Sequence, residues 1–321
     1  MKYQVVITDC PWQDISIEEK ILSEIGAEVR RFQCGSSEEV IAAAQDADAL
    51  LLGWAPITKA VVEALPKCRI MVRYGVGYNN VDVDAATAAG IAVANNPDYC
   101  MDEVATHALA LVLACHRQLS PLMTEVRAGA WDPTTMKPMP RLNEQTVGII
   151  GYGRIGRRFA GMIRPLVKRV VAYDPMIQES DGQANMLPLE DVLRSADYLS
   201  IHAPLTIDTE HLIRAETLSL MKSGAFLVNC SRGQIVDETA LVAALRAGTL
   251  GGAALDVFET EPLPKDDPLR EFSNVIITPH AAWFSQTADY ELRANPSKLI
   301  CEFLLGKPVR LLNVPRARQE L

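Results

Sequence analysis

This chain of 321 residues lacks several features that mark particular classes of protein. No apolar run approaches the roughly 20 residues that cross a bilayer, and the longest are stretches such as 108–115. The net charge of −9 argues against a general binder of nucleic acid or of membrane surfaces. Residues 1–8 begin an apolar strand at once and carry no signal-peptide pattern. We therefore expect a cytoplasmic protein that binds neither nucleic acid nor a membrane.

The seven cysteines form no pattern typical of disulfide pairing or of a zinc site. They are scattered between Cys10 and Cys301, their number is odd, and no two are spaced as C-x-x-C. This pattern predicts reduced thiols rather than disulfides or a zinc site, and we expect no bound metal.

Strand-like and helix-like segments alternate along nearly the whole chain, which predicts parallel sheets covered by helices on both faces. Strands are expected at 5–8, 28–32, 49–52, 70–73, 91–94, 147–150, 169–173, 198–201, 226–229, 253–255 and 275–278. Helices are expected at 17–25, 38–44, 58–65, 85–89, 102–118 and 288–306. Asp102 is a candidate N-cap of the helix at 102–118. Pro296 is expected to kink or divide the last helix. Residues 311–321 are expected to fray.

A G-x-G-x-x-G motif occupies residues 151–156, between an apolar strand and a helical segment. Gly151 allows a tight turn, Gly153 lets the backbone approach a pyrophosphate, and Gly156 lets the helix pack closely on the strand. Asp174 ends the next strand, where its carboxylate can bind both ribose hydroxyls and repel a 2′-phosphate. The motif therefore predicts a site for NAD rather than NADP.

Three polar residues, Arg232, Glu261 and His280, each follow an apolar strand of the second half of the chain. Taken singly, they are typical of a surface arginine, a solvated turn and a structural histidine. Together, at one edge of one sheet, they suit a single chemistry. Arginine holds a carboxylate with two parallel hydrogen bonds, histidine moves a proton near neutral pH, and glutamate orients the imidazole and stabilises its charge.

The order and spacing of the motifs resemble those of the D-isomer-specific 2-hydroxyacid dehydrogenases over nearly the whole chain. The matching segments are Arg73–Asp82, Thr146–Gly156, Ser200–Thr206, Asn229–Gly233, Asp256–Pro262 and Thr278–His280. Within that family, Pro279–Trp283 is similar to the branch that contains the C-terminal binding protein corepressors.

This resemblance implies an α/β fold of two doubly wound parallel-sheet domains. The larger is a Rossmann NAD-binding domain, residues 100–287, inserted into a flavodoxin-like substrate domain of residues 1–99 and 288–321. It also implies a homodimer built on the cofactor domains.

The resemblance assigns roles to residues of this chain. The catalytic residues are Arg232, Glu261 and His280. The cofactor-binding residues are Gly151, Gly153, Arg154, Ile155, Gly156, Asp174, His202, Pro204, Thr209, Cys230, Ser231, Asp256 and His280. The substrate-binding residues are Arg73, Val76, Gly77, Arg232 and Trp283.

The expected activity is hydride transfer between NAD(H) and a small 2-oxo or D-2-hydroxy acid, with His280 as acid and base. Trp283, Tyr74 and Tyr99, with Trp12 and Trp54 as further candidates, favour an apolar or aromatic side chain on the substrate. Two alternatives stay open. One is an NAD(H)-sensing, corepressor-like scaffold that binds peptide partners, and the other is a phosphoglycerate- or hydroxypyruvate-type dehydrogenase.

Overall fold

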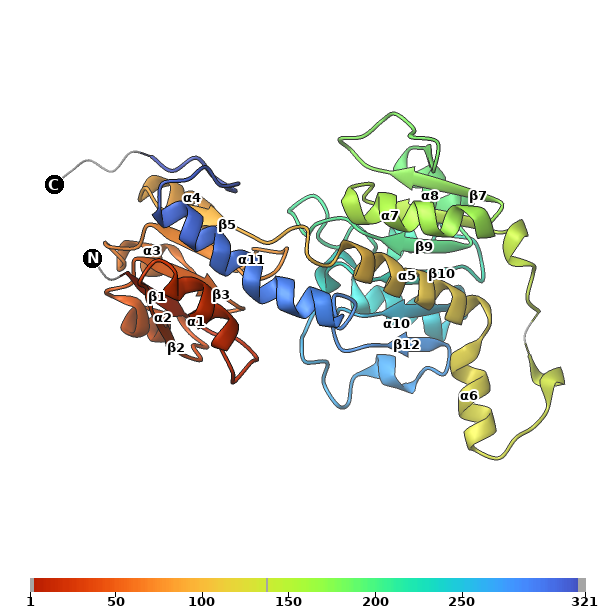
Figure 1. The fold of residues 1–321 in the computed structure, drawn as a ribbon. Coiled ribbons are helices and arrows are strands. Elements are labelled where there is room, and N and C mark those ends of the chain that lie inside the picture. The colour runs from red at the N-terminus through yellow and green to blue at the C-terminus, as the bar shows by residue number, and fades with distance from the viewer. Residues whose placement is uncertain (1–2, 137, 317–321) are drawn as a thin grey trace. The chain divides into compact units, whose positions relative to one another are not determined.

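The computed structural model describes residues 3–136 and 138–316, which form two units (Figure 1). Unit 1 joins the chain up to Tyr99 with the chain from Ser285 onward, and unit 2 is Cys100–Phe284. Unit 2 is therefore an insertion in unit 1, and its second boundary lies three residues before the expected one. Within the described residues, no helix is long and apolar enough to span a membrane.

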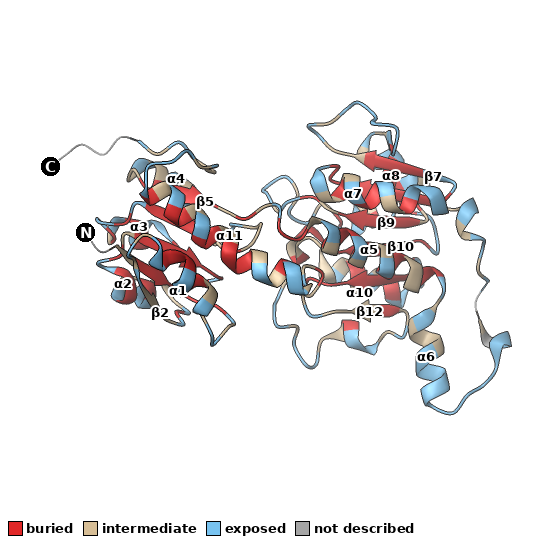
Figure 2. Ribbon diagram, in the orientation of Figure 1, coloured by how far each residue is buried: buried red, intermediate tan, exposed pale blue. Residues whose placement is uncertain are grey.

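Unit 1 is built on a five-stranded parallel sheet. Its strands lie in the order β2 (Glu28–Arg31), β1 (Gln4–Ile7), β3 (Ala49–Leu52), β4 (Ile70–Arg73) and β5 (Ala92–Ala94). This is the flavodoxin-like order, as predicted. Its helices are α1 (Ser16–Ser23), α2 (Ser37–Ala44), α3 (Lys59–Glu63), α4 (Val83–Ala88) and α11 (Gln286–Leu304). The central strands are buried because helices cover both faces of such a sheet (Figure 2).

Helix α11 is a single helix (Figure 1) that contains Pro296, so the expected division is wrong, and the expected kink stays a prediction. Ser285 caps the helix by accepting a hydrogen bond from the Ala288 N–H at 3.0 Å. One turn before the proline, Arg293 forms a buried ion pair of 2.7 Å with Glu18 of α1. Proline removes one backbone hydrogen bond, and the burial of the helix on both sides of Pro296 offsets that loss.

The chain after α11 is also more ordered than expected. The Leu312 N–H donates to the Val93 carbonyl at 2.8 Å, and the Asn313 side chain accepts from the Val93 N–H at 2.8 Å. The Asn313 amide also donates to the Ile91 carbonyl at 3.0 Å. Residues 311–316 are therefore not frayed, and the rest of that prediction, 317–321, lies outside the described residues.

Unit 2 contains a seven-stranded parallel sheet. Its strands lie in the order β12 (Val275–Ile277), β11 (Gly252–Leu255), β10 (Phe226–Asn229), β9 (Tyr198–Ile201), β6 (Thr146–Ile150), β7 (Arg169–Tyr173) and β8 (Asn185–Met186). The order reverses between β6 and β9, as in a Rossmann domain. Six strands were expected, and β8 was missed because two residues cannot show a strand pattern.

The helices of unit 2 are α5 (Met101–His116), α6 (Leu119–Arg127), α7 (Arg154–Ile163), α8 (Leu189–Ser195), α9 (Ala215–Leu218) and α10 (Glu238–Arg246). The expected cap of α5 is wrong, because Cys100 occupies the N-cap position. Asp102 lies in the first turn, where its carboxylate pairs with Arg158 of α7. The two helices pack against each other, so the ion pair joins neighbours.

Candidate active site

The glycine motif forms the turn that leaves β6 at the point where the strand order reverses. Gly151 has φ +87°, and a Cβ there would lie 2.4 Å from the Ala203 nitrogen. A Cβ on Gly156 would lie 2.2 Å from the Gly151 carbonyl oxygen, whereas a Cβ on Gly153 would meet nothing within 4 Å. The fold thus requires glycine at positions 151 and 156, whereas Gly153 leaves an open space in front of α7. These surroundings fit the three predicted roles.

The N-terminus of α7 faces this open space. Gly153 is its N-cap residue, and no side chain caps the helix there. The first N–H groups of a helix, together with its dipole, favour an anionic group such as a pyrophosphate. The turn and the helix N-terminus therefore form a cradle with the polarity that a pyrophosphate needs.

Asp174 is held next to this turn at the end of β7. One carboxylate oxygen accepts from the Tyr152 N–H at 2.8 Å, and the other accepts from the Met176 N–H at 2.9 Å. The Tyr152 hydroxyl donates to the Asp181 carboxylate at 2.7 Å, and Arg157 forms an ion pair with Asp181 at 2.6 Å. The two backbone contacts fix the Asp174 carboxylate beside the cradle, and its predicted role against a 2′-phosphate stays a prediction.

His202 follows β9, on the other side of the switch point. Its Nε2 lies 2.9 Å from the Ser200 hydroxyl, and its ring packs 5.0 Å from that of Phe159. The buried Nδ1 has no hydrogen-bond partner among the described residues. Burial lowers the pKa of His202 to about 4, so the ring is neutral near pH 7. A buried polar atom of this kind is costly unless a ligand or water satisfies it.

Glu261 and His280 form a close pair. His280 Nδ1 lies 2.6 Å from Glu261 Oε2, and about a third of each side chain is exposed. The other Glu261 oxygen accepts from the Phe258 N–H at 2.9 Å. Burial raises the pKa of Glu261, but the His280 contact, the Phe258 N–H and the Arg232 charge outweigh it and lower that pKa overall. Glu261 is therefore ionised near neutral pH and can hold a proton on Nδ1 of His280.

Arg232 follows β10 and completes the predicted group. One of its guanidinium nitrogens donates to the Ser231 carbonyl at 2.6 Å. Its positive charge also acts on Glu261. The carboxyl ends of β10, β11 and β12 thus bring a cation, an anion and an imidazole into one region of unit 2.

Comparison with known proteins agrees with this arrangement. A family model described as "D-isomer specific 2-hydroxyacid dehydrogenase, NAD binding domain" matches residues 109–282. A glyoxylate reductase of Korarchaeum cryptofilum is 40% identical over 84% of this chain and 82% of its own length. The chain belongs to the D-isomer specific 2-hydroxyacid dehydrogenase family. The family predicted from the sequence, and its NAD cofactor, are thereby confirmed.

Other members of the family differ in length. A D-3-phosphoglycerate dehydrogenase of Methanocaldococcus jannaschii is 36% identical over 99% of this chain, which spans only 60% of that relative. A D-lactate dehydrogenase of Aquifex aeolicus, solved with NAD and lactic acid, superposes with a TM-score of 0.84 at 28% identity. The match covers 94% of this chain and 96% of that one. The present protein is thus itself an NAD-dependent oxidoreductase, and it has the same fold as this relative.

The remaining predicted cofactor residues of the dehydrogenase lie on the loops after β9 and β10. The Thr209 hydroxyl donates to the Pro204 carbonyl at 2.7 Å, and the Ser231 hydroxyl donates to Asn229 at 3.0 Å. Burial and the nearby Asp256 raise the pKa of the Cys230 thiol, which keeps it protonated. These contacts shape the loops, and the predicted cofactor contacts of these residues stay predictions, as do those of Arg154 and Ile155.

Asp256 has a second role that the sequence did not indicate. Its side chain is fully buried, and its two oxygens accept from the N–H groups of Ala281 and Ala282 at 2.9 and 2.8 Å. Its backbone carbonyl accepts from the His280 N–H at 2.8 Å. Asp256 therefore holds the loop that carries His280.

The predicted substrate residues are divided between the units. Arg73, Val76 and Gly77 belong to unit 1, whereas Trp283 belongs to unit 2 and packs edge-on to Phe284 at 5.5 Å. Arg73 lies over the ring of Trp54 at 5.4 Å.

Of the further aromatic candidates, Tyr74 is only 2% exposed and lies against Trp12 at 5.4 Å. Its expected place on a pocket wall is therefore wrong, because it belongs to the interior of unit 1. Tyr99 is also buried, at 8% exposure, so its expected place on a pocket wall is equally unsupported.

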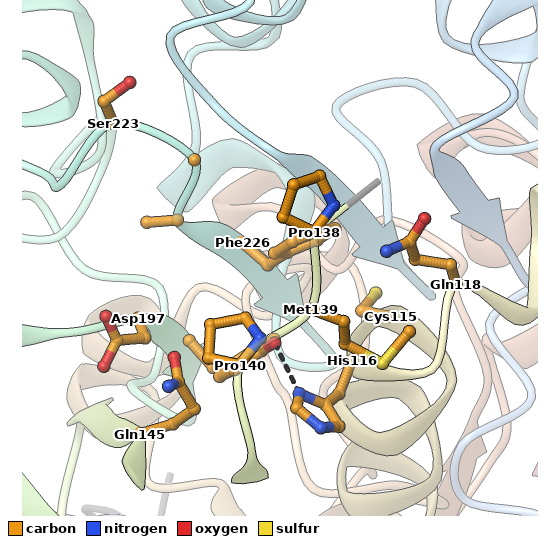
Figure 3. A pocket seen from close by; sticks show the side chains of 13 residues that line it. Cys115, His116, Gln118, Pro138, Met139, Pro140, Gln145, Asp197, Ser223 and Phe226 are labelled. Atoms are coloured by element: carbon orange, nitrogen blue, oxygen red, sulfur yellow. Dashed lines mark hydrogen bonds between the residues drawn. The ribbon is translucent and has the colours of Figure 1, made fainter. Parts of the chain in front are cut away.

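A cavity of about 250 Å³ in unit 2 lies at the opposite edge of the sheet (Figure 3). It is lined by residues that precede or begin β6, β9 and β10, among them Gln145, Asp197 and Phe226. His116 of α5 also lines it, with Nδ1 2.9 Å from the Tyr198 hydroxyl. Doubly wound sheets bind ligands at the carboxyl ends of their strands, so this cavity is not part of the active site.

Replacing Gly153 by Ala tests the cradle. We expect the variant to fold with an unchanged melting temperature, because the added methyl group meets nothing within 4 Å. We expect its NADH affinity to fall by about tenfold or more, equal to ~1.4 kcal/mol, because the methyl group occupies the space for the pyrophosphate. Titration calorimetry and thermal unfolding measure the two effects.

Two variants serve as controls for this experiment. Gly161→Ala adds a methyl group to α7 at a site equally open and should bind NADH normally. Gly151→Ala should be destabilised, because its φ of +87° and the nearby Ala203 backbone exclude a side chain. Normal NADH binding by Gly153→Ala would show that the cofactor lies elsewhere.

The imidazole of His202, whose Nδ1 is buried, makes stability depend on pH. Its pKa is about 4 in the folded protein and 6.5 in the unfolded chain, so only the unfolded chain takes up the proton between these values. The free energy of unfolding should thus be flat above pH 6.5 and fall towards pH 4, by at most ~1.4 kcal/mol per pH unit from this group. Urea unfolding at several pH values should show a shallower fall in His202→Gln. Equal slopes in both proteins would contradict a buried neutral ring.

Proposed function

We propose that this protein interconverts a small 2-oxo acid and its D-2-hydroxy acid with NAD(H), using His280 as acid and base. The observation that carries the proposal is the 2.6 Å contact between His280 and Glu261, beside the charge of Arg232. The three side chains lie at the same edge of the sheet as the cradle for the dinucleotide. A proton donor, its orienting carboxylate and a carboxylate-binding cation are the groups that this reaction needs.

The protein's own residues then act in defined ways. Arg232 binds the substrate carboxylate and polarises the oxygen on C2. Because Nδ1 of His280 is engaged by Glu261, Nε2 is the nitrogen that gives a proton to that oxygen during reduction and takes it back during oxidation. Ionised Glu261 stabilises the imidazolium form. When bound, the nicotinamide supplies or accepts the hydride at C2.

The nature of the substrate is part of the proposal. Arg73, Val76 and Gly77 are proposed to complete the carboxylate site, and Trp283 to pack on the substrate side chain. The name glyoxylate reductase, carried by a relative 40% identical, supports a small 2-oxo acid. The phosphoglycerate dehydrogenases among the relatives keep that alternative open, although this chain spans only part of their length. The resemblance of Pro279–Trp283 to the corepressor branch and a cytoplasmic location stay predictions.

A substrate panel tests the activity. NADH oxidation is followed by absorbance with glyoxylate, hydroxypyruvate, phosphohydroxypyruvate, pyruvate, and branched and aromatic 2-oxo acids, and NADPH is tested in parallel. We expect turnover with NADH, and a loss of on the order of a thousandfold in kcat for His280→Asn, whose NADH affinity should be retained. Asparagine is chosen because His280 has φ +53°, which asparagine tolerates better than most residues.

The matched control is His211→Asn, at an exposed histidine of the same unit with φ +47°. It should retain full turnover. If His280→Asn turned over the substrate as fast as His211→Asn, His280 would have no role in the mechanism. Intact NADH binding by the wild type without turnover across the panel would favour the cofactor-sensing scaffold.

We also propose that the protein is a homodimer formed through α6 and the segment after it. Helix α6 has no buried residue (Figure 2). Leu119, Met123 and Val126 on this helix are each 45–50% exposed. Trp131, just beyond the helix, is 87% exposed. A cluster of large apolar side chains on one helix and the turn after it is typical of a surface that another chain covers.

Replacing Met123 by Glu tests this surface. Sedimentation of the wild type should give a dimer, and the variant should dissociate at least tenfold more readily, because a charge would be buried in the contact. Leu305→Glu places the same charge at an exposed apolar residue of unit 1 and should leave the dimer intact. A monomeric wild type, or a dimer unaffected by Met123→Glu, would exclude this interface.

A further inference from the structure

A row of three side chains in unit 2 leads from helix α5 to the loop that carries His280. His107 of α5 has its Nε2 3.1 Å from the hydroxyl of Thr278, which directly follows β12. That hydroxyl lies 2.5 Å from Oδ1 of the fully buried Asp256, after β11. His107 Nε2 is itself 3.8 Å from the same carboxylate oxygen. The row thus joins a helix to the ends of two strands.

The direction of these hydrogen bonds follows from the donors available. An aspartate carboxylate only accepts, so the Thr278 hydroxyl must give its single proton to Asp256. The same hydroxyl oxygen can then only accept from His107. Nε2 of His107 therefore carries a proton, and the row runs from His107 through Thr278 to Asp256.

The loop at the end of this row needs support. His280 has φ +53°, a left-handed conformation that is unfavourable for a residue with a side chain. The N–H of His280 is bonded to the Asp256 carbonyl, and those of Ala281 and Ala282 are bonded to the Asp256 carboxylate. The orientation of that carboxylate therefore decides whether the N–H groups of Ala281 and Ala282 keep their partners. Thr278 and His107 provide further contacts to the same carboxylate.

We infer that His107 is a positioning residue of this dehydrogenase: through Thr278 it orients the Asp256 carboxylate, which holds residues 280–282 so that the His280 imidazole meets both Glu261 and the substrate. The inference rests on the proposed function, since it assigns a role towards its acid and base. His107 acts through its neighbours and does not take part in proton exchange with the substrate. A small displacement of a catalytic group is enough to lower turnover strongly.

Two pairs of variants of the full-length protein test the row. His107→Leu and Thr278→Val remove the hydrogen bonds and keep similar shapes, whereas His107→Gln and Thr278→Ser keep a donor and a hydroxyl. With the best 2-oxo acid of the panel, kcat should fall by about tenfold in each of the first pair and stay within about threefold of the wild type in the second. The KM for the 2-oxo acid and the NADH affinity should change little, and the losses in kcat should not follow the melting temperature across the four variants.

The double variant His107→Leu/Thr278→Val provides a sharper reading. Because both changes break the same row, its kcat should be close to that of the single variants rather than tenfold lower again. Thr106→Val removes an exposed hydroxyl from the residue before His107 in α5 and serves as the control, whose kcat should be unchanged. Additive losses, unchanged kcat in His107→Leu, or losses that follow the melting temperature would overturn the inference.

A measurement that needs no turnover separates this inference from the proposed function. The chain has five histidines, so side-chain NMR can follow the proton on Nδ1 of His280, assigned with the His280→Asn variant. That signal should shift or broaden in His107→Leu and return to its wild-type position in His107→Gln. If it does so while the wild type turns over no 2-oxo acid, the positioning role stands and the proposed activity fails. An unaltered signal in His107→Leu overturns the positioning role.

Discussion

The hydrogen bond between Glu261 and His280 is the interaction on which the proposed chemistry depends. It occupies one nitrogen of the imidazole and leaves the other available for the proposed proton exchange. It also joins the loops that follow two neighbouring strands, β11 and β12. Everything around the pair serves to keep those loops in place: the Phe258 N–H fixes the glutamate, and the contacts of Asp256 fix the histidine loop.

The parallel sheet explains why these groups meet. All strands of unit 2 point the same way, so the residues that follow them gather at one edge. The glycine turn after β6 and His202 after β9 lie at the switch point of that edge, and Arg232, Glu261 and His280 follow the next strands in spatial order. One topological rule thus places both the dinucleotide cradle and the acid–base pair, at the edge opposite to the cavity beside His116.

Strands and the positions of the candidate site residues could be predicted because their signals are local. Buried parallel strands such as Ala49–Leu52 appear as short apolar runs, and Arg232 and His280 each lie three residues after such a strand. What was missed depends on contacts between distant segments. The sequence around Pro296 does not indicate that an ion pair between Arg293 and Glu18 anchors its helix. The sequence around Asn313 likewise does not indicate the hydrogen bonds that it forms with Ile91 and Val93.

The row from His107 to Asp256 was missed for the same reason. His107 lies on a helix whose pattern is dominated by apolar residues, and the sequence does not show that this helix passes beside Thr278. A polar residue within an apolar helical pattern was the available signal, although it specifies no partner. The sequence thus indicated the proposed acid–base residues but not the contacts that hold their loop.

The ordered chain after α11 has a consequence for the behaviour of the protein in concentrated solution. Strand β5 is the last strand of its sheet, and an uncovered last strand offers free N–H and C=O groups to any other extended chain. Leu312 and Asn313 bond to both polar groups of Val93 and fill those positions from within the same molecule. The segment therefore occupies the outward-facing backbone groups of Val93 and protects this position of unit 1 from pairing with another chain.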